Sequence, residues 1–125
     1  MAAVPQPILD YLDAIRRFDG NALLAAFAPD AVVVDERVIY RGLREISGWI
    51  EDAIVVARPV VTLRLTAPVG AEQRVVADIS GPNLARPLLA TLSFTILDEH
   101  VSRLEISRRE PDPQAFENPR AGRLP

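Results

Sequence analysis

The spacing of apolar residues changes once along the chain, from a helical period to a period of two. Between residues 7 and 18, apolar side chains recur every three or four positions, as in an amphipathic helix. The segment ALLAAF, which follows Asp19-Gly20-Asn21, predicts a second short helix that ends at Pro29. A third helix is predicted from Gly42 to Pro59, because apolar residues again recur at helical spacing.

From residue 60 onward, apolar and polar residues alternate, which is the pattern of strands with one buried face. This alternation predicts four long strands, over residues 60–67, 74–80, 88–97 and 101–107. Two shorter strands, AVVV and VIY, flank Asp35-Glu36-Arg37 and predict a hairpin. The whole order is that of an α+β domain in which helices pack on one face of an antiparallel sheet.

The apolar faces of these elements predict one core. Its expected members are Leu63, Leu65, Leu88, Leu92, Phe94 and Leu104 from the strands, with Ile15 and Ile46 from the helices. In the last strand, Leu104 and Ile106 are expected to point inward and Val101 to the opposite face. A chain of 125 residues is long enough for one such domain, which we place at residues 1–107. Residues 108–125 hold four prolines and little periodicity, so they are interpreted as a tail.

The composition removes several kinds of chemistry. The chain has no cysteine and no lysine, which excludes thiolate nucleophiles, thiolate metal ligands, Schiff bases and a lysine base. With a single histidine and no clustered acids at ligand spacing, no metal site is expected. A net charge of −3, with basic and acidic residues interspersed, argues against nucleic acid as a partner. Asp, Glu, Tyr and one His remain for proton transfer.

No membrane partner is expected either. No apolar run reaches the roughly 18 residues that a membrane-spanning helix requires. The N-terminal segment MAAVPQP lacks a basic region followed by an apolar one. No secretory signal is therefore predicted, and the cytoplasm is the expected compartment.

The segment FAPDAVVVDERVIYRG holds the arrangement that suggests chemistry. Asp35 follows the apolar run Val32-Val33-Val34, which must pack against the helical layer that carries Tyr11 on its inward stripe. In an apolar pocket, an aspartate can act as a general base and a tyrosine as a hydrogen-bond donor to an oxyanion. The other interpretation is a solvated aspartate in a turn and a tyrosine of the core. His100 and the run Arg108-Arg109-Glu110 are interpreted as exposed residues of a turn and of a strand end.

The chain contains the stretch YLDAIRRFDGNALLAAFAPDAVV, then a carboxylate, and then YRG before a helix with Ile46 and Trp49. This pattern resembles the nuclear transport factor 2-like superfamily, in particular its SnoaL-like branch. The resemblance covers residues 7 to 107. It implies a cone-shaped fold, in which a strongly curved sheet wraps around three helices and leaves an apolar pocket at the open end. It further implies a small apolar ligand, no cofactor, and a homodimer formed through the outer sheet face. That face would present Thr62, Arg64, Asp78, Thr91, Ser93, Arg103 and Glu105.

Within this superfamily, the catalytic pattern that matches is that of ketosteroid isomerases. The stretch YLDAIRRFDGNALLAAFAPDAVVVD aligns with it without a gap, which places Tyr11 on their tyrosine and Asp35 on their general base. Their second acid, which helps to bind the oxyanion, falls at about Leu92 here. The expected pocket residues are Phe27, Trp49, Leu63, Leu92 and Phe94. SnoaL-type polyketide cyclases, which move a proton during ring closure, remain an alternative.

Two functions are consistent with this sequence. The first is a cofactor-independent proton-transfer enzyme of isomerase or cyclase type that acts on a small apolar carbonyl compound. In it, Asp35 would abstract a proton next to the carbonyl and Tyr11 would hold the enolate oxygen. The second is a non-catalytic module of the same fold that binds a small ligand or a partner. The two differ in whether several polar groups converge in the pocket.

Overall fold

The computed structural model describes residues 4–82 and 84–109. The helices of this part of the chain are α1 (Gln6–Arg16), α2 (Gly20–Ala25) and α3 (Gly42–Ile50), which continues into a π-helical segment, η1 (Glu51–Val56). The strands are β1 (Phe27–Asp35), β2 (Val38–Arg41), β3 (Val60–Val69), β4 (Glu72–Ser80), β5 (Leu88–Leu97) and β6 (His100–Arg109). They form one sheet in the order β2-β1-β6-β5-β4-β3.

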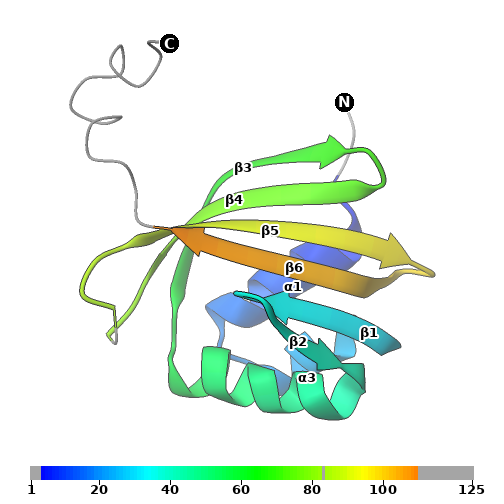
Figure 1. The fold of residues 1–125 in the computed structure, drawn as a ribbon, viewed down its shortest axis with the longest axis horizontal. Coiled ribbons are helices and arrows are strands. Elements are labelled where there is room, and N and C mark those ends of the chain that lie inside the picture. Colours follow the sequence, from blue (N-terminus) through cyan, green and yellow to red (C-terminus); the bar gives the residue numbers. More distant parts are fainter. Residues whose placement is uncertain (1–3, 83, 110–125) are drawn as a thin grey trace.

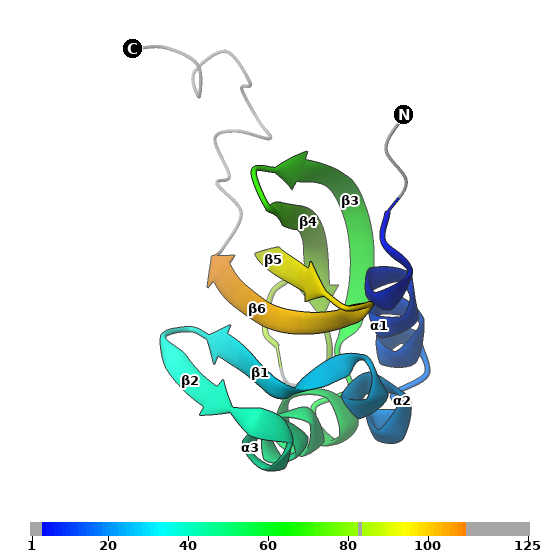
Figure 2. The same cartoon turned by 90° about the vertical axis from the view of Figure 1, so that its right-hand side faces the viewer.

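The sheet curls around α1, with α2 and α3 closing the lower side of the layer (Figures 1 and 2). Neighbouring strands are antiparallel except for β1 and β6, which are parallel. This is the predicted α+β architecture of a strongly curved sheet over N-terminal helices; the sheet was predicted to be antiparallel, and the pair of β1 and β6 is the departure from that. The inward side chains of the sheet and the apolar stripes of α1 and α3 form one buried core. Among the residues predicted for that core, Ile15, Ile46, Leu92, Phe94 and Leu104 are buried and Leu88 is half-buried.

The second helix is shorter than predicted. Asp19 caps it by accepting a hydrogen bond from the backbone N–H of Ala22 at 3.1 Å, but the helix ends at Ala25 rather than at Pro29. Pro29 instead lies within β1, at the place where the pairing of β1 with β6 shifts register. A residue without an N–H is tolerated there because the ladder is already interrupted.

The prediction that Leu63 and Leu65 are buried was wrong, since they are 50% and 54% exposed. A register shift falls between them, so Leu63 pairs with Ala77 while Leu65 pairs with Val76. Paired residues of antiparallel strands share a face. Leu65 therefore moves to the outer face, and Leu63 stays on the inner face of a strand that forms the edge of the sheet.

A second irregularity changes the face of Val101, which was predicted to point outward and is fully buried. Between the pairs Val101–Ile96 and Arg103–Thr95, Ser102 is the extra residue, and its hydroxyl donates to the carbonyl of Thr95 at 3.1 Å. Such a bulge lets Val101 and Leu104 both face the core. Strand β6 continues to Arg109, two residues past the predicted end. Of the predicted tail, residues 110–125 lie outside the described part of the chain.

Candidate active site

Asp35 is the last residue of β1 and does not lie in the turn. The turn is formed by Glu36 and Arg37, both with positive φ angles of 50° and 74°, as in the tight hairpins whose twist matches that of the strands. Along β1, the buried positions Ala31, Val33 and Asp35 alternate with more exposed ones. Asp35 thus continues the inward face of the strand, and only 7% of its surface is exposed.

Arg108 faces Asp35 from the neighbouring strand. It follows Leu104 and Ile106 at a period of two on β6, and its register partner on β5 is the buried Ala90. Its Nη2 atom donates to both carboxylate oxygens of Asp35. The strand end is fixed by Glu36, whose Oε1 accepts the backbone N–H of Arg108 at 2.7 Å. The hairpin turn therefore positions both members of the ion pair.

Trp49 holds the carboxylate from the other side. It lies on α3, where it is buried, and its indole Nε1 donates to Oδ2 of Asp35 at 2.9 Å. Oδ2 thus accepts two hydrogen bonds, whereas Oδ1 accepts one, from Arg108 alone. A carboxylate oxygen has about two lone-pair sites, so Oδ1 keeps one for a further proton.

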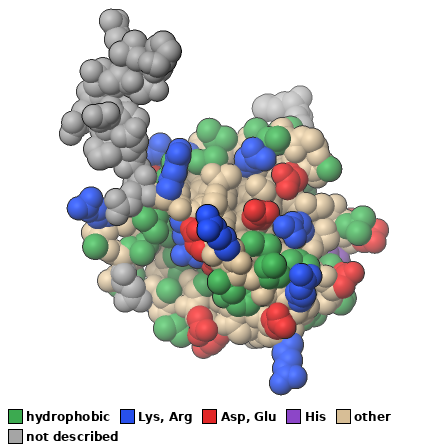
Figure 3. Space-filling view, in the orientation of Figure 1, with side chains coloured by type: hydrophobic (Ala, Val, Ile, Leu, Met, Phe, Trp, Pro, Cys, Tyr) green, Lys and Arg blue, Asp and Glu red, His purple; other side chains and the backbone are tan. Residues whose placement is uncertain are grey.

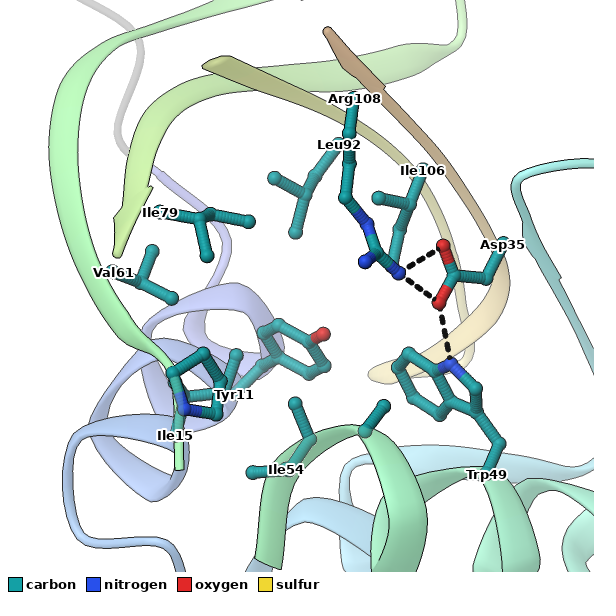
Figure 4. Close-up of a pocket in the computed structure, with 12 residues that line it drawn as sticks. Tyr11, Ile15, Asp35, Trp49, Ile54, Val61, Ile79, Leu92, Ile106 and Arg108 are labelled. Atoms are coloured by element: carbon teal, nitrogen blue, oxygen red, sulfur yellow. Dashed lines mark hydrogen bonds and ion pairs between the residues drawn. The ribbon is translucent and has the colours of Figure 1, made fainter. Parts of the chain in front are cut away.

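Tyr11 brings a hydroxyl group to the same place from α1. Its ring is 1% exposed and packs edge-on against Phe94 and Phe27, with centroid distances of 5.2 and 6.0 Å. Its hydroxyl has no hydrogen-bond partner among the described residues and points into the space in front of Arg108 (Figure 4). Burial, together with the nearby Asp35 charge, raises the pKa of Tyr11 well above its ordinary value, and the charge of Arg108 offsets only part of this. The hydroxyl is therefore a proton-bearing donor at neutral pH.

These polar groups line one cavity of about 60 Å³ whose remaining wall is mainly apolar (Figure 4). Since a single water needs roughly 10–15 Å³ of such volume, the cavity has room for one small ring or a group of a few atoms. The apolar wall is formed by Ile15, Ala53, Ile54, Pro59, Val61, Ile79, Leu92 and Ile106. A compound with one apolar ring and one polar oxygen would complement this surface.

The sequence-predicted site residues divide into three groups. Tyr11, Asp35, Trp49 and Leu92 line the cavity. Phe27 and Phe94 do not; they lie behind the cavity wall, where they pack against the rings of Tyr11 and Trp49. Leu63 is separate from the site, because it lines a groove between α1 and the edge of the sheet.

Arg108 is the residue of this cavity that the sequence interpretation missed, because it was interpreted as part of an exposed strand end. The signal that identifies it is the period of two itself. Leu104 and Ile106 point inward, so the next inward position of the strand is Arg108. A charged residue at an inward position is rarely buried without a partner, and here its partner is Asp35.

The described residues contain no group of three or more His, Cys, Asp or Glu side chains that could hold a metal ion. His100 lies in the β5–β6 hairpin, exposed, with Nδ1 2.9 Å from the carbonyl oxygen of Asp98. Within the described part of the chain, no helix is both long and apolar enough to cross a membrane.

Comparison with family models and with curated proteins gave no match. Among solved structures, a candidate polyketide cyclase from Sinorhizobium meliloti is 36% identical in sequence, with a TM-score of 0.77 over 83% of this chain and 95% of that one. This chain belongs to the nuclear transport factor 2-like superfamily, in its SnoaL-like branch.

Two solved structures with lower sequence identity share the fold. A protein with a ketosteroid isomerase-like fold from Catenulispora acidiphila, in complex with trimethylamine, is 19% identical, with a TM-score of 0.71 over 84% of this chain and 86% of that one. TerC, co-crystallised with polyporic acid, is 18% identical, with a TM-score of 0.71 over 90% and 93% of the two chains.

Proposed function

We propose that this protein is a cofactor-independent proton-transfer enzyme of isomerase or cyclase type, acting on a small apolar carbonyl compound. The proposal rests on one observation: a buried carboxylate and a tyrosine hydroxyl that has no hydrogen-bond partner within residues 4–82 and 84–109 line the same, mainly apolar cavity. Removing a proton next to a carbonyl requires a base at the carbon and a hydrogen-bond donor at the oxygen. Asp35 and Tyr11 supply this pair.

Asp35 is the base of the proposed reaction. Its Oδ2 is held by Trp49 and Arg108, which fixes the orientation of the carboxylate, and Oδ1 retains a lone pair for the incoming proton. The rest of the cavity wall is apolar, so a substrate that fills the cavity would displace water from the carboxylate, and its carbon would not compete with solvent for Asp35.

In the reaction, Oδ1 of Asp35 takes a proton from the carbon beside the carbonyl. The electron pair of that C–H bond forms a C=C bond, and the carbonyl π electrons move to the oxygen, which becomes an enolate held by the Tyr11 hydroxyl. Return of the proton to another carbon gives isomerisation. Attack of the enolate carbon on a second carbonyl gives ring closure, with the proton transferred to the new alkoxide.

The relatives support this reaction class. The S. meliloti protein carries the name of a candidate polyketide cyclase, and ring closure through an enolate needs the same base and donor. TerC, which was co-crystallised with polyporic acid, supports a small organic molecule as the ligand of this fold.

The test is the exchange of α-protons for deuterium, because it reports proton abstraction without knowledge of the natural substrate. The protein is added to 2-indanone in D₂O, and the loss of the α-proton signal is followed by ¹H NMR. We expect wild-type protein to accelerate exchange, Asp35→Asn to return it to the buffer rate, and Tyr11→Phe to slow it about 10²-fold.

The control is Asp30→Asn, which removes an exposed carboxylate from the same strand. It is expected to exchange at the wild-type rate. Exchange by Asp35→Asn at the wild-type rate would rule out Asp35 as the base.

The second candidate is a non-catalytic binding module, and the ion pair itself favours it. Arg108 and Trp49 together engage both oxygens of Asp35, as in a structural salt bridge. In that case 2-indanone would bind in the cavity and its α-protons would exchange at the buffer rate with every variant.

A further inference from the structure

Arg108 uses only one of its three guanidinium nitrogens on Asp35. Nη2 donates to both carboxylate oxygens, whereas Nη1 and Nε have no hydrogen-bond partner among the described residues. A guanidinium carries five N–H donors in a rigid plane, so three of them remain for another acceptor. Figure 4 shows the guanidinium group above the cavity, facing Tyr11 across it.

Arg108 also stands between two cavities. It lines the cavity of Asp35 and Tyr11, and it lines a second one of about 90 Å³ formed with Ala57, Ser80, Gly81 and Leu84. Ala53, Pro59 and Ile79 belong to both walls. Its side chain is 32% exposed, so it is the polar group of the site that reaches furthest toward solvent. A ligand that extends from the inner cavity into the second one would lie beside the guanidinium.

The charges of the site set a condition on the reaction. Before proton transfer, the negative charge is on Asp35 and the positive charge on Arg108. After transfer, Asp35 is neutral and the negative charge is on the substrate oxygen. An uncompensated charge in an apolar cavity is costly. Arg108 must therefore compensate the Asp35 carboxylate before the transfer and the substrate oxyanion after it.

We propose that Arg108 is a further catalytic residue whose hydrogen bonds move from the carboxylate of Asp35 to the oxyanion of the substrate during the reaction. This inference rests on the proposed function. In this exchange, the hydrogen bonds from Nη2 to Asp35 break as the carboxylate becomes a carboxylic acid. The free guanidinium N–H groups and the Tyr11 hydroxyl donate to the oxyanion. The substrate class is therefore a carbonyl compound that reacts as an enolate, and stable enolates of acidic enols are its mimics.

Binding of a preformed enolate must then take up a proton. The reactants are the Asp35–Arg108 ion pair, the free anion and one proton from solvent; the product is neutral Asp35 with the anion on Arg108. Among the described residues, the titratable or charged groups around Asp35 are Arg108 on β6, Tyr11 on α1 and, in the adjacent turn, Glu36, which accepts the backbone N–H of Arg108. Trp49 on α3 contributes a neutral donor. Tyr11 keeps its own proton at neutral pH because burial raises its pKa, so the proton that is taken up goes to Asp35.

The experiment compares two probes of nearly the same shape, 1,3-cyclohexanedione, which is an enolate at neutral pH, and its neutral enol ether, 3-methoxycyclohex-2-enone. Binding is followed by the fluorescence of Trp49, which is the single tryptophan of the chain and lines the cavity. Calorimetry in two buffers of different ionisation enthalpy measures proton uptake. Wild-type protein is expected to bind the enolate at least about tenfold more tightly than the ether, with uptake of about one proton.

Arg108→Gln is expected to lose this preference, and Arg109→Gln to keep it. Arg109 is the matched control, because it is the next residue of the same strand, carries the same charge and is exposed. Arg108→Lys, which keeps a cation without the planar fork, should retain part of the preference and the proton uptake.

Equal affinity of wild-type protein for the two probes, or enolate binding without proton uptake, would overturn the proposal whether or not the variants fold. If 2-indanone exchange is not catalysed but the enolate preference and proton uptake depend on Arg108, the proposed function fails and the partner exchange of Arg108 stands as a property of the binding site.

Discussion

At the scale of single residues, the site combines a carboxylate, a guanidinium and a phenol that line one cavity. Asp35 is almost inaccessible to solvent, and Arg108 places a cation beside its carboxylate. The same burial keeps the Tyr11 hydroxyl protonated. An acceptor of protons and a donor of hydrogen bonds therefore coexist at one cavity, which is the combination that enolate chemistry requires.

The raised pKa of Tyr11 predicts a specific loss of stability at high pH. Because the folded protein retains a proton that the unfolded chain releases near the ordinary pKa of 10.0, the contribution of Tyr11 is fully present below that pH and is lost as the pH rises above it. The free energy of unfolding of wild-type protein should fall more steeply than that of Tyr11→Phe, by about 1.4 kcal/mol per pH unit above a pH of about 10. Urea unfolding followed by Trp49 fluorescence measures this.

The background of this measurement is low, since the chain has no lysine or cysteine and arginine does not titrate in proteins. Tyr40→Phe is the control, because Tyr40 is the other tyrosine of the chain and is only half-buried. If the free energy of unfolding falls with the same slope for wild-type protein and Tyr11→Phe above a pH of about 10, the hydroxyl of Tyr11 ionises in the folded protein as easily as in the unfolded chain.

At the scale of elements, the limits of prediction from the sequence come from two single-residue irregularities. The period of two located the inward faces of β4 and β5, and with them Leu92 and Phe94. It misplaced Leu65 and Val101, because the register shifts in β3 and β6 depend on pairing between strands and leave no mark in the local pattern. The same period predicts an inward position for Arg108, but a charged side chain is usually exposed to solvent. Only the structure shows that Asp35 faces it as a partner.

The start of α3 gives a prediction about backbone conformation. Gly42 has a φ of +77°, and an added Cβ would meet only the carbonyl oxygen of Pro29, at 3.8 Å. The cost of Gly42→Ala therefore comes from the left-handed conformation, about 1 to 2 kcal/mol. Gly48→Ala, in the same helix and with no atom within 4 Å of the new Cβ, should stabilise the protein by about 0.5 to 1 kcal/mol. Urea unfolding of the two variants measures both values, and changes of the same sign would contradict this account.

At the scale of the whole molecule, the described helices pack on the inner side of the sheet and leave its outer face uncovered (Figures 1 and 2). Acidic and basic side chains are interspersed over it (Figure 3). They form the ion pairs Arg64–Asp78 at 2.8 Å and Arg103–Glu105 at 3.2 Å. Leu65, displaced to this face by the irregularity in the edge strand β3, adds an exposed apolar side chain. Such a mixture of paired charges and apolar side chains fits a two-fold interface.

We therefore propose that two copies associate through the face that bears Thr62, Arg64, Asp78, Thr91, Ser93, Arg103 and Glu105. Light scattering at micromolar protein concentration should give twice the mass of the chain. Leu65→Glu should shift the protein to the monomer, because it places an unpaired charge in the interface. Leu9→Glu, at an exposed position of α1, should not. A wild-type protein that is monomeric under these conditions would refute the interface.

The central claim, that a carbonyl ligand lies beside Asp35, is tested most directly by the indole N–H resonance of Trp49 in a ¹H–¹⁵N NMR spectrum. The chain has one tryptophan, so the spectrum has one such signal, and its N–H group donates to Asp35. On titration with 2-indanone, we predict that this resonance shifts and saturates together with the backbone signals of Tyr11 and Arg108. If 2-indanone binds and shifts signals elsewhere while the Trp49 indole resonance does not move, the ligand lies outside this cavity and the account is contradicted.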